Sequence, residues 1–107
     1  MILLIERLEL EVIIGILSFE REKRQKIIID AELEYDYCGE YLNYVEIVDF
    51  LSLEFEKNRY GLLEEALQDL NSKLRQNFPT LTKISLSIKK PDILPNCVVG
   101  VKVEMTK

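Results

Sequence analysis

Histidine is missing altogether from the 107 residues of this chain. Without imidazole there can be no His-based zinc site, no serine–histidine pair and no histidine acid–base catalysis. Cysteine is scarce, and the spacing of Cys38 and Cys97 fits neither a metal site nor a disulfide framework. We therefore expect reduced thiols in a cytoplasmic protein. An enzyme of this sequence has to work with carboxylates, lysine, tyrosine or cysteine.

The chain also has fewer positive than negative charges, and it lacks long apolar runs. Fourteen Lys and Arg residues stand against nineteen Asp and Glu residues, and the net charge of −5 argues against nucleic acid or an anionic membrane as the main partner. The first residues carry no cationic stretch and reach a charge at Glu6, so we expect neither a signal peptide nor a transmembrane span. The hydrophobic share of 48% predicts one packed domain over residues 1–107, which is too short for two cores.

Two segments alternate apolar and polar residues with the period of a strand. The longer one runs from Lys26 to Tyr37, and the other has its apolar residues at Leu8, Leu10, Val12 and Ile14. They predict a hairpin with one apolar and one charged face. The connection, near residues 15–24, is longer than a tight hairpin needs.

The middle of the chain changes to the period of a helix. Residues 44–57 and 62–78 carry apolar stripes at helical spacing, and Gly61 and Pro79 flank the second stripe. Period two returns at residues 84–89 and 99–105. This order predicts an α+β fold, in which a four-stranded antiparallel sheet carries two helices on one face (ββααββ).

Such a sheet has a polar open face and two unpaired edge strands. Edges pair readily with another chain, so copies can close into a ring or barrel with their polar faces around a channel. A monomer with one solvated face fits the pattern equally well. The alternation by itself leaves both arrangements open.

Four polar side chains fall where the predicted strands and helices begin or end: Glu20, Tyr44, Glu64 and Lys90. Glu20 lies in the first connection, Tyr44 opens the first helix, and Lys90 ends the third strand. Glu64 is in the first turn of the second helix, where the positive end of the helix dipole gives a carboxylate an ordinary role. A solvated charge would equally explain Glu20 and Lys90, and a core aromatic would explain Tyr44. Taken singly, none of these residues is a specific signal.

Together they belong to segments that follow one another in a familiar order. The segments are Ile14-Gly15-Ile16 with Phe19-Glu20, Gln25-Lys26, Leu42-Asn43-Tyr44, Leu62-Leu63-Glu64, Lys90-Pro91 and Val99-Gly100-Val101. In spacing and in strand–helix order the chain resembles dihydroneopterin aldolase, a folate-pathway enzyme of the tunnelling fold, over nearly its whole length. It departs from that pattern in a connection before Tyr44 that shrinks to about residues 38–42. It also departs at Ile14, near which relatives carry a histidine or an aromatic residue.

The resemblance implies a pterin substrate and a role for each residue. Glu64 would anchor the pterin through its 2-amino group and ring N–H, and the backbone at Leu63 would complete that edge. Lys90 would be the principal acid–base residue, while Tyr44 and Glu20 manage protons and Glu20 also orients hydroxyls and the catalytic water. The site would be assembled between subunits of a homo-oligomer, a tetrameric ring that stacks into an octamer, with no metal and no cofactor.

Cleavage without a cofactor is chemically reasonable for this substrate. Aldolases usually use a lysine Schiff base or a metal as the electron sink, whereas a 7,8-dihydropterin contains its own imine. The implied reaction is retro-aldol cleavage of 7,8-dihydroneopterin, with epimerisation by cleavage and re-addition. There are two alternatives. One is an epimerase of dihydroneopterin triphosphate, with cations from Arg21, Lys23 and Arg24; the other is a non-catalytic oligomeric module.

The unpaired edges of the predicted sheet give a first prediction, that the chain forms an oligomer by pairing strand edges. Light scattering at micromolar concentration should give a multiple of the 12.5 kDa subunit mass. One ring would have four times that mass, and two stacked rings would have eight times. A monomeric mass would contradict the prediction.

Overall fold

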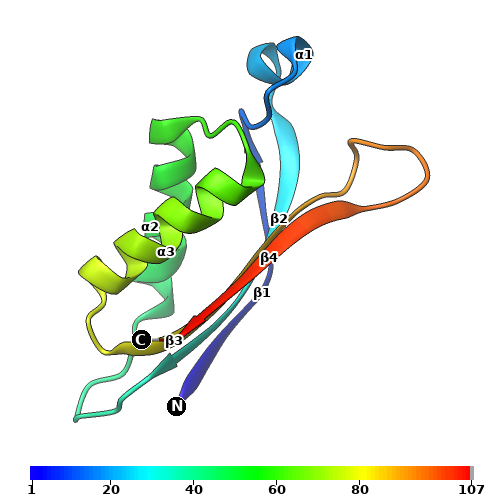
Figure 1. Ribbon diagram of the computed structural model, residues 1–107. Helices are drawn as coiled ribbons and strands as arrows, with labels where there is room; N and C mark the ends of the chain where they lie inside the picture. The colour runs from blue at the N-terminus through cyan, green and yellow to red at the C-terminus, as the bar shows by residue number, and fades with distance from the viewer. Residues whose placement is uncertain (107) are drawn as a thin grey trace.

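The computed structural model describes residues 1–106. In chain order the elements are β1 (Ile2–Val12), α1 (Ser18–Glu22), β2 (Gln25–Tyr35), α2 (Tyr44–Asn58), α3 (Leu63–Asn77), β3 (Leu81–Lys90) and β4 (Val99–Thr106). The strands form one antiparallel sheet in the order β1-β2-β3-β4, and α2 and α3 lie together on one of its faces (Figure 1). The predicted α+β fold, a four-stranded sheet with two helices on one face, is confirmed. Lys107, the last residue of the predicted domain, lies outside the described residues.

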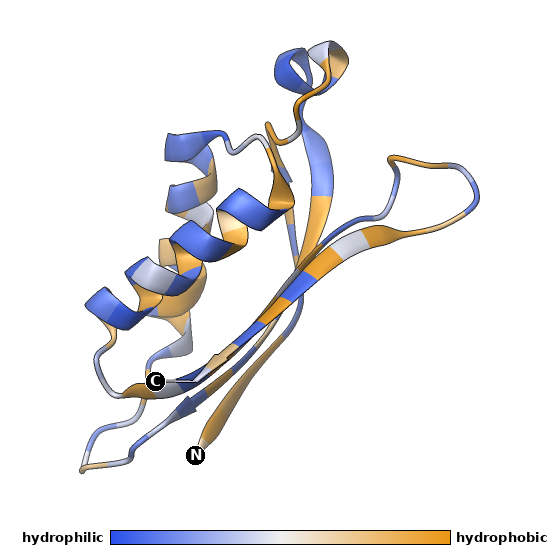
Figure 2. Cartoon of the chain, viewed as in Figure 1, coloured by the Kyte–Doolittle hydropathy of each residue, from blue (hydrophilic) through white to orange (hydrophobic). Residues whose placement is uncertain are grey.

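The alternating pattern of the strands becomes one buried face and one open face. On β2, Ile27, Ile29 and Leu33 are fully buried and belong to the core beneath the helices. Asp30 and Glu32 project from the opposite face. Along β4 the same alternation is visible as bands of hydrophobic and hydrophilic residues (Figure 2). The core therefore lies between the helices and one face of the sheet.

Each long helix turns one apolar side to the sheet. The α2 helix begins where the Asn43 side chain accepts a hydrogen bond from the N–H of Val45 at 2.9 Å, which is a typical N-cap. It ends at Asn58, and the left-handed φ of 44° at the next residue, Arg59, stops the helix. The buried apolar residues are, on α2, Ile47, Leu51 and Phe55 and, on α3, Leu63, Ala66, Leu67, Leu70 and Leu74. Across residues 1–106, no helix combines the length and the apolarity needed to cross a membrane.

A β-bulge explains why the sequence pattern underestimated the length of β1. Glu6 and Arg7 together oppose the single residue Asp30 on β2. Arg7 has a φ of 56°, and its N–H donates to the Asp30 carboxylate at 2.9 Å. The extra residue shifts the alternation by one, so the inward-facing residues are odd-numbered before the bulge and even-numbered after it. The pattern that begins at Leu8 therefore misses the first part of the strand.

The connections at the two ends of the sheet also differ from the prediction. The segment near residues 15–24 contains the short helix α1 rather than a plain turn. This helix and the β3–β4 loop lie at the end of the sheet opposite the N-terminus (Figure 1). At the other end β2 stops at Tyr35, and the ring of Tyr37 stacks on that of Tyr41 with centroids 4.7 Å apart.

Candidate active site

Glu20 on α1 is a buried carboxylate, although it stands in a run of charged residues. It is 4% exposed, which is rare for a glutamate without partners. Its Oε2 atom accepts hydrogen bonds from Lys90 Nζ at 2.8 Å and from Gln25 Nε2 at 2.9 Å. Its Oε1 atom accepts one from the N–H of Leu17 at 3.3 Å. Glu20 is therefore not an ordinary solvated charge in an exposed turn.

Gly15 makes room for this carboxylate. Its φ of +122° is a conformation that residues with side chains rarely adopt. A Cβ atom at this position would overlap the carboxyl group of Glu20. The glycine after β1 is therefore required by the place that Glu20 occupies.

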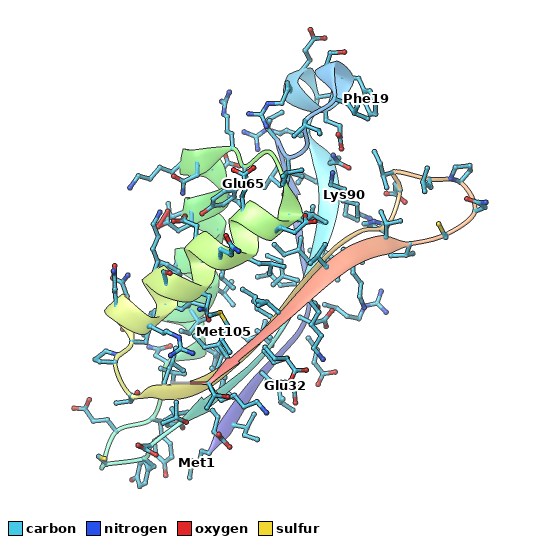
Figure 3. The ribbon with its side chains drawn as sticks, viewed as in Figure 1. Met1, Phe19, Glu32, Glu65, Lys90 and Met105 are labelled. Carbon is cyan, nitrogen blue, oxygen red and sulfur yellow. The ribbon has the colours of Figure 1, made fainter. Side chains whose placement is uncertain are left out.

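Lys90 reaches Glu20 from the last position of β3. Its side chain is 12% exposed, so the ion pair is largely shielded from water. Figure 3 shows Lys90 at the end of the molecule that carries Phe19 and α1. Lys89 points to the open face, where its Nζ lies 3.9 Å from Asp30 Oδ2 and half of its side chain is exposed. Neighbouring residues on a strand point to opposite faces, so the two lysines have different surroundings.

Burial and hydrogen bonding act on the pKa of Glu20 in opposite directions. Burial raises this pKa, but the hydrogen bonds from Lys90, Gln25 and Leu17, together with the charge of Lys90, lower it by more. The net result is a pKa below its ordinary value of 4.5. Glu20 is therefore ionised at neutral pH and keeps a full negative charge beside the lysine.

The first turn of α3 lies at the same end of the molecule as the ion pair. Leu63 is buried there, whereas Glu64 is exposed. Glu65, the next residue, marks this turn in Figure 3 at the end that also carries Phe19 and Lys90. In the described part of the chain the Glu64 carboxylate has no side-chain ion pair. It is therefore available to a ligand.

Tyr44 lies at the other end of the molecule. It is the first residue of α2 and is 63% exposed. The last turn of α2 is next to α1, because the guanidinium of Arg21 donates to the carbonyl oxygen of Arg59 at 2.9 Å. Fifteen helical residues at a rise of about 1.5 Å each separate the two ends of α2 by about 22 Å, and Figure 1 shows α2 running between the ends of the molecule. Within one chain, Tyr44 does not meet Glu20 and Lys90.

Gln25 is a residue of this site whose role the sequence did not reveal. Its Nε2 donates both to Glu20 Oε2 and to the carbonyl oxygen of Ile14, the latter at 2.8 Å. It thereby joins the start of β2 to the loop after β1 and to the buried carboxylate. Gln25 stands in one of the segments that carry the resemblance. A polar residue at the start of a strand, however, does not indicate which way its side chain turns.

A hollow of about 940 Å³ lies elsewhere, on the open face of the sheet, where Asp30, Ser87 and Lys89 are among the residues that line it. The five candidate site residues are not among them. The candidate residues Glu20 and Lys90 thus lie at the end of the sheet and not in the hollow of its open face.

The lowered pKa of Glu20 predicts a dependence of stability on pH. In the unfolded chain a glutamate has a pKa of about 4.3, and in the folded chain the pKa of Glu20 is below its ordinary value. Ionised Glu20 therefore stabilises the fold above the unfolded pKa, and this contribution disappears as the pH falls through the folded pKa. Urea unfolding between about pH 6 and about pH 3 should show the loss, and Glu20→Gln should lose less free energy of unfolding over that range. Equal losses in the two proteins would contradict the prediction.

Comparison with known proteins identifies relatives of the same architecture. The family model described as dihydroneopterin aldolase matches residues 3–106. A candidate dihydroneopterin aldolase from Vibrio cholerae has a TM-score of 0.90 and 23% identity, over 99% of this chain and 97% of that one. The E. coli dihydroneopterin aldolase in complex with neopterin has a TM-score of 0.88 and 24% identity, over 97% of each chain. A Burkholderia thailandensis dihydroneopterin aldolase bound to guanine has a TM-score of 0.82 and 20% identity, over 100% of this chain and 91% of that one.

At these identities the solved structures establish the shared fold alone, and a search of curated proteins finds no significant match. The family model, in contrast, extends over almost every residue of the chain. The chain belongs to the dihydroneopterin aldolase family.

Proposed function

We propose that this chain cleaves 7,8-dihydroneopterin into 6-hydroxymethyl-7,8-dihydropterin and glycolaldehyde, a carbon–carbon lyase reaction of folate biosynthesis. Membership of the family supports this activity. The neopterin complex of the E. coli relative supports a pterin as the ligand. The observation that carries the proposal is the shielded ion pair of Lys90 and Glu20 at 2.8 Å. A lysine held beside an ionised carboxylate is a group that can give and take protons at a fixed position.

The reaction breaks the bond between the first and second carbon atoms of the pterin side chain. A base takes the proton from the hydroxyl on the second carbon, a carbonyl forms there, and glycolaldehyde leaves. The electron pair of the broken bond moves into the ring imine, which an acid has protonated, and an enamine results. Protonation of the first carbon and loss of the ring proton restore the imine. The substrate supplies the electron sink, so the protein has to hold the ring and move protons.

Lys90 is the acid–base residue in this proposal, and Glu20 fixes its position. Lys90 Nζ donates one hydrogen bond to Glu20, and its remaining N–H bonds can reach substrate atoms. Glu20 is itself held by Gln25 and by the N–H of Leu17, so the pair is rigid before the substrate arrives. The same carboxylate can align the side-chain hydroxyls and a water molecule, and Tyr44 is the further proton-transfer group.

Glu64 and Leu63 form the ring-binding edge. An ionised carboxylate is purely an acceptor and complements the 2-amino group and ring N–H that a pterin presents side by side. The first turn of a helix also favours the negative charge of Glu64, and the backbone of Leu63 is next to it. Since this turn and Lys90 lie at one end of the molecule (Figure 3), a ring held by Glu64 can direct its side chain towards the acid–base pair.

In this proposal Tyr44 reaches the site from a neighbouring copy of the chain, because its own helix holds it far from Lys90. Apolar side chains are exposed at both ends of the molecule. They include Ile16 and Phe19 around α1, and Val45 beside Tyr44. Burying them between copies favours assembly. Pairing of the free edges of β1 and β4 would close four subunits into a ring, and two rings would stack into an octamer.

The triphosphate epimerase has less support than the aldolase. Arg21 donates to three backbone carbonyl oxygens, and both Nη atoms of Arg24 bind the carboxylate of Glu56. Of the three cations considered for a triphosphate, this leaves the exposed Lys23. A non-catalytic module, for its part, gives no reason to bury a charged glutamate at the end of the sheet, which costs free energy.

Incubation with 7,8-dihydroneopterin, followed by chromatography, should detect both 6-hydroxymethyl-7,8-dihydropterin and glycolaldehyde. Lys90→Ala should lower turnover by about 10² to 10⁴, the usual effect of removing general acid–base catalysis. Lys90→Gln can still donate to Glu20, so it should keep the fold while losing turnover to a similar extent. Affinity for the ring should change far less, because Glu64 holds it.

Lys89→Ala is the matched control for these variants. Lys89 is the preceding residue of the same strand, but it faces the open side of the sheet near Asp30. Its loss should leave turnover nearly unchanged. Equal losses at the two lysines, or a loss at Lys90 confined to binding, would contradict the assignment of Lys90.

Binding of neopterin should depend on Glu64. Glu64→Ala should weaken binding by about 1.5–3 kcal/mol or more, since the carboxylate accepts charge-assisted hydrogen bonds from the ring. Titration followed by the intrinsic fluorescence of the pterin measures this affinity. Glu65→Ala, an exposed neighbour in the same helical turn, should bind like the unmodified protein. Unchanged affinity in Glu64→Ala would reduce Glu64 to an ordinary helix-end charge.

A further inference from the structure

We propose that Arg21 is a positioning residue, which sets the distance between the acid–base pair on α1 and β3 and the ring-binding turn of α3. The inference rests on the proposed function, because it assigns chemistry to Glu20 and Lys90 and ring binding to Glu64. These two halves of the site are on different elements. A reaction that breaks a bond in the side chain of a held ring needs a fixed distance between them.

Arg21 joins three backbone carbonyl groups with one side chain. Its Nη1 donates to the carbonyl oxygens of Gly15 at 3.0 Å and of Tyr60 at 3.1 Å. Its Nη2 donates to the carbonyl oxygen of Arg59 at 2.9 Å. Gly15 is in the loop that holds the Glu20 carboxylate, and Arg59 and Tyr60 are in the connection from α2 to α3. One guanidinium therefore connects the two halves of the site.

The connection that Arg21 holds is short and is coupled to α3. Residues 59–62 join α2 to α3, so Tyr60 is four residues from Glu64. The carbonyl oxygen of Tyr60 also accepts a hydrogen bond from the N–H of Gly15 at 3.2 Å. The side chain of Tyr60 is buried, and its hydroxyl donates to Asp69 Oδ2 on α3. A displacement of Tyr60 would therefore move the first turn of α3.

The guanidinium group is chemically suited to this task. It is planar and presents several N–H donors in a fixed fork, whereas the lysine ammonium is a compact point charge. Arg59 caps the C-terminal end of α2, so the guanidinium of Arg21 also lies at the negative end of that helix dipole. Arg21 is the residue after Glu20 on α1. A displacement of Arg21 therefore also displaces Glu20, which accepts the hydrogen bond from Lys90.

Arg24 provides a matched control within the same segment. It donates to the carbonyl oxygen of Glu11 at 3.0 Å and makes a two-pronged ion pair with Glu56 on α2. Arg24 therefore ties the same part of the chain to α2, with a similar number of hydrogen bonds. It does not contact the connection to α3. Loss of Arg24 removes a similar number of hydrogen bonds but should leave the distance between the two halves of the site unchanged.

The test compares Arg21→Ala, Arg21→Lys and Arg24→Ala in the full chain, with 7,8-dihydroneopterin as substrate and neopterin as the binding probe. Arg21→Ala should lower kcat by about ten- to a hundredfold, since displacements of about 1 Å at a reacting centre can have such effects. Its affinity for neopterin should stay within about twofold, because the Glu64 turn itself is intact. Arg21→Lys should recover part of kcat, and Arg24→Ala should keep kcat within about twofold at a similar thermal midpoint.

A second readout does not depend on activity. The Gly15 N–H donates to the carbonyl oxygen of Tyr60, and the Arg59 N–H donates to that of Phe55. Hydrogen exchange of these two amides should become faster in Arg21→Ala and not in Arg24→Ala, because Arg21 alone of the two holds that connection. Equal losses of kcat in the two alanine variants, a loss confined to neopterin affinity, or unchanged exchange of the Gly15 and Arg59 amides would each overturn the role of Arg21. If the unmodified chain neither cleaves dihydroneopterin nor binds neopterin, the proposed function fails instead, while the exchange measurement still tests the contact.

Discussion

Burying the carboxylate of Glu20 costs free energy unless donors surround it, and much of one end of the molecule is arranged to supply them. Gly15 leaves the space, Gln25 and the N–H of Leu17 donate, and Lys90 brings the opposite charge from 70 positions further along the chain. Buried ion pairs add little to stability compared with apolar residues of similar volume. The pair connects α1, β2 and β3, and in the proposed function it is the group that transfers protons.

The same fold keeps other groups away from that pair. The α2 helix carries Tyr44 to the opposite end of the molecule, while the turn that contains Glu64 lies at the end that also carries Lys90. In the proposed function, Tyr44 at one end and the pair of Glu20 and Lys90 at the other act on one substrate where two copies meet. The free edges of the sheet and the exposed apolar side chains at both ends are the surfaces through which such a meeting would occur.

The helices and strands could be predicted from spacing because burial of one face imposes its own period on the sequence. The alternation that begins at Lys26 and the apolar stripe of α3 are strong examples, and both became buried faces of the core, although β2 ends at Tyr35 and Tyr37 is exposed. The prediction failed where the backbone shifts the alternation of inward- and outward-facing side chains. At the bulge opposite Asp30 one extra residue reverses which side chains face inward, and α1 is too short to show a helical period. Such features depend on how strands pair, which local spacing does not record.

For the site, the sequence by itself determined which chemical groups are present and in which order. It excluded histidine chemistry, put a carboxylate in the first connection and a lysine at the end of the third strand, and placed both in segments that resemble one family. What the tertiary structure decided is that Glu20 is buried, that Lys90 and not Lys89 turns to it, and that Tyr44 is too far away in the same chain. Contacts between distant residues follow from strand register and from the packing of helices on the sheet. These contacts are therefore determined by the whole fold, whereas the periodic pattern of a helix or strand can be read from the sequence of that segment alone.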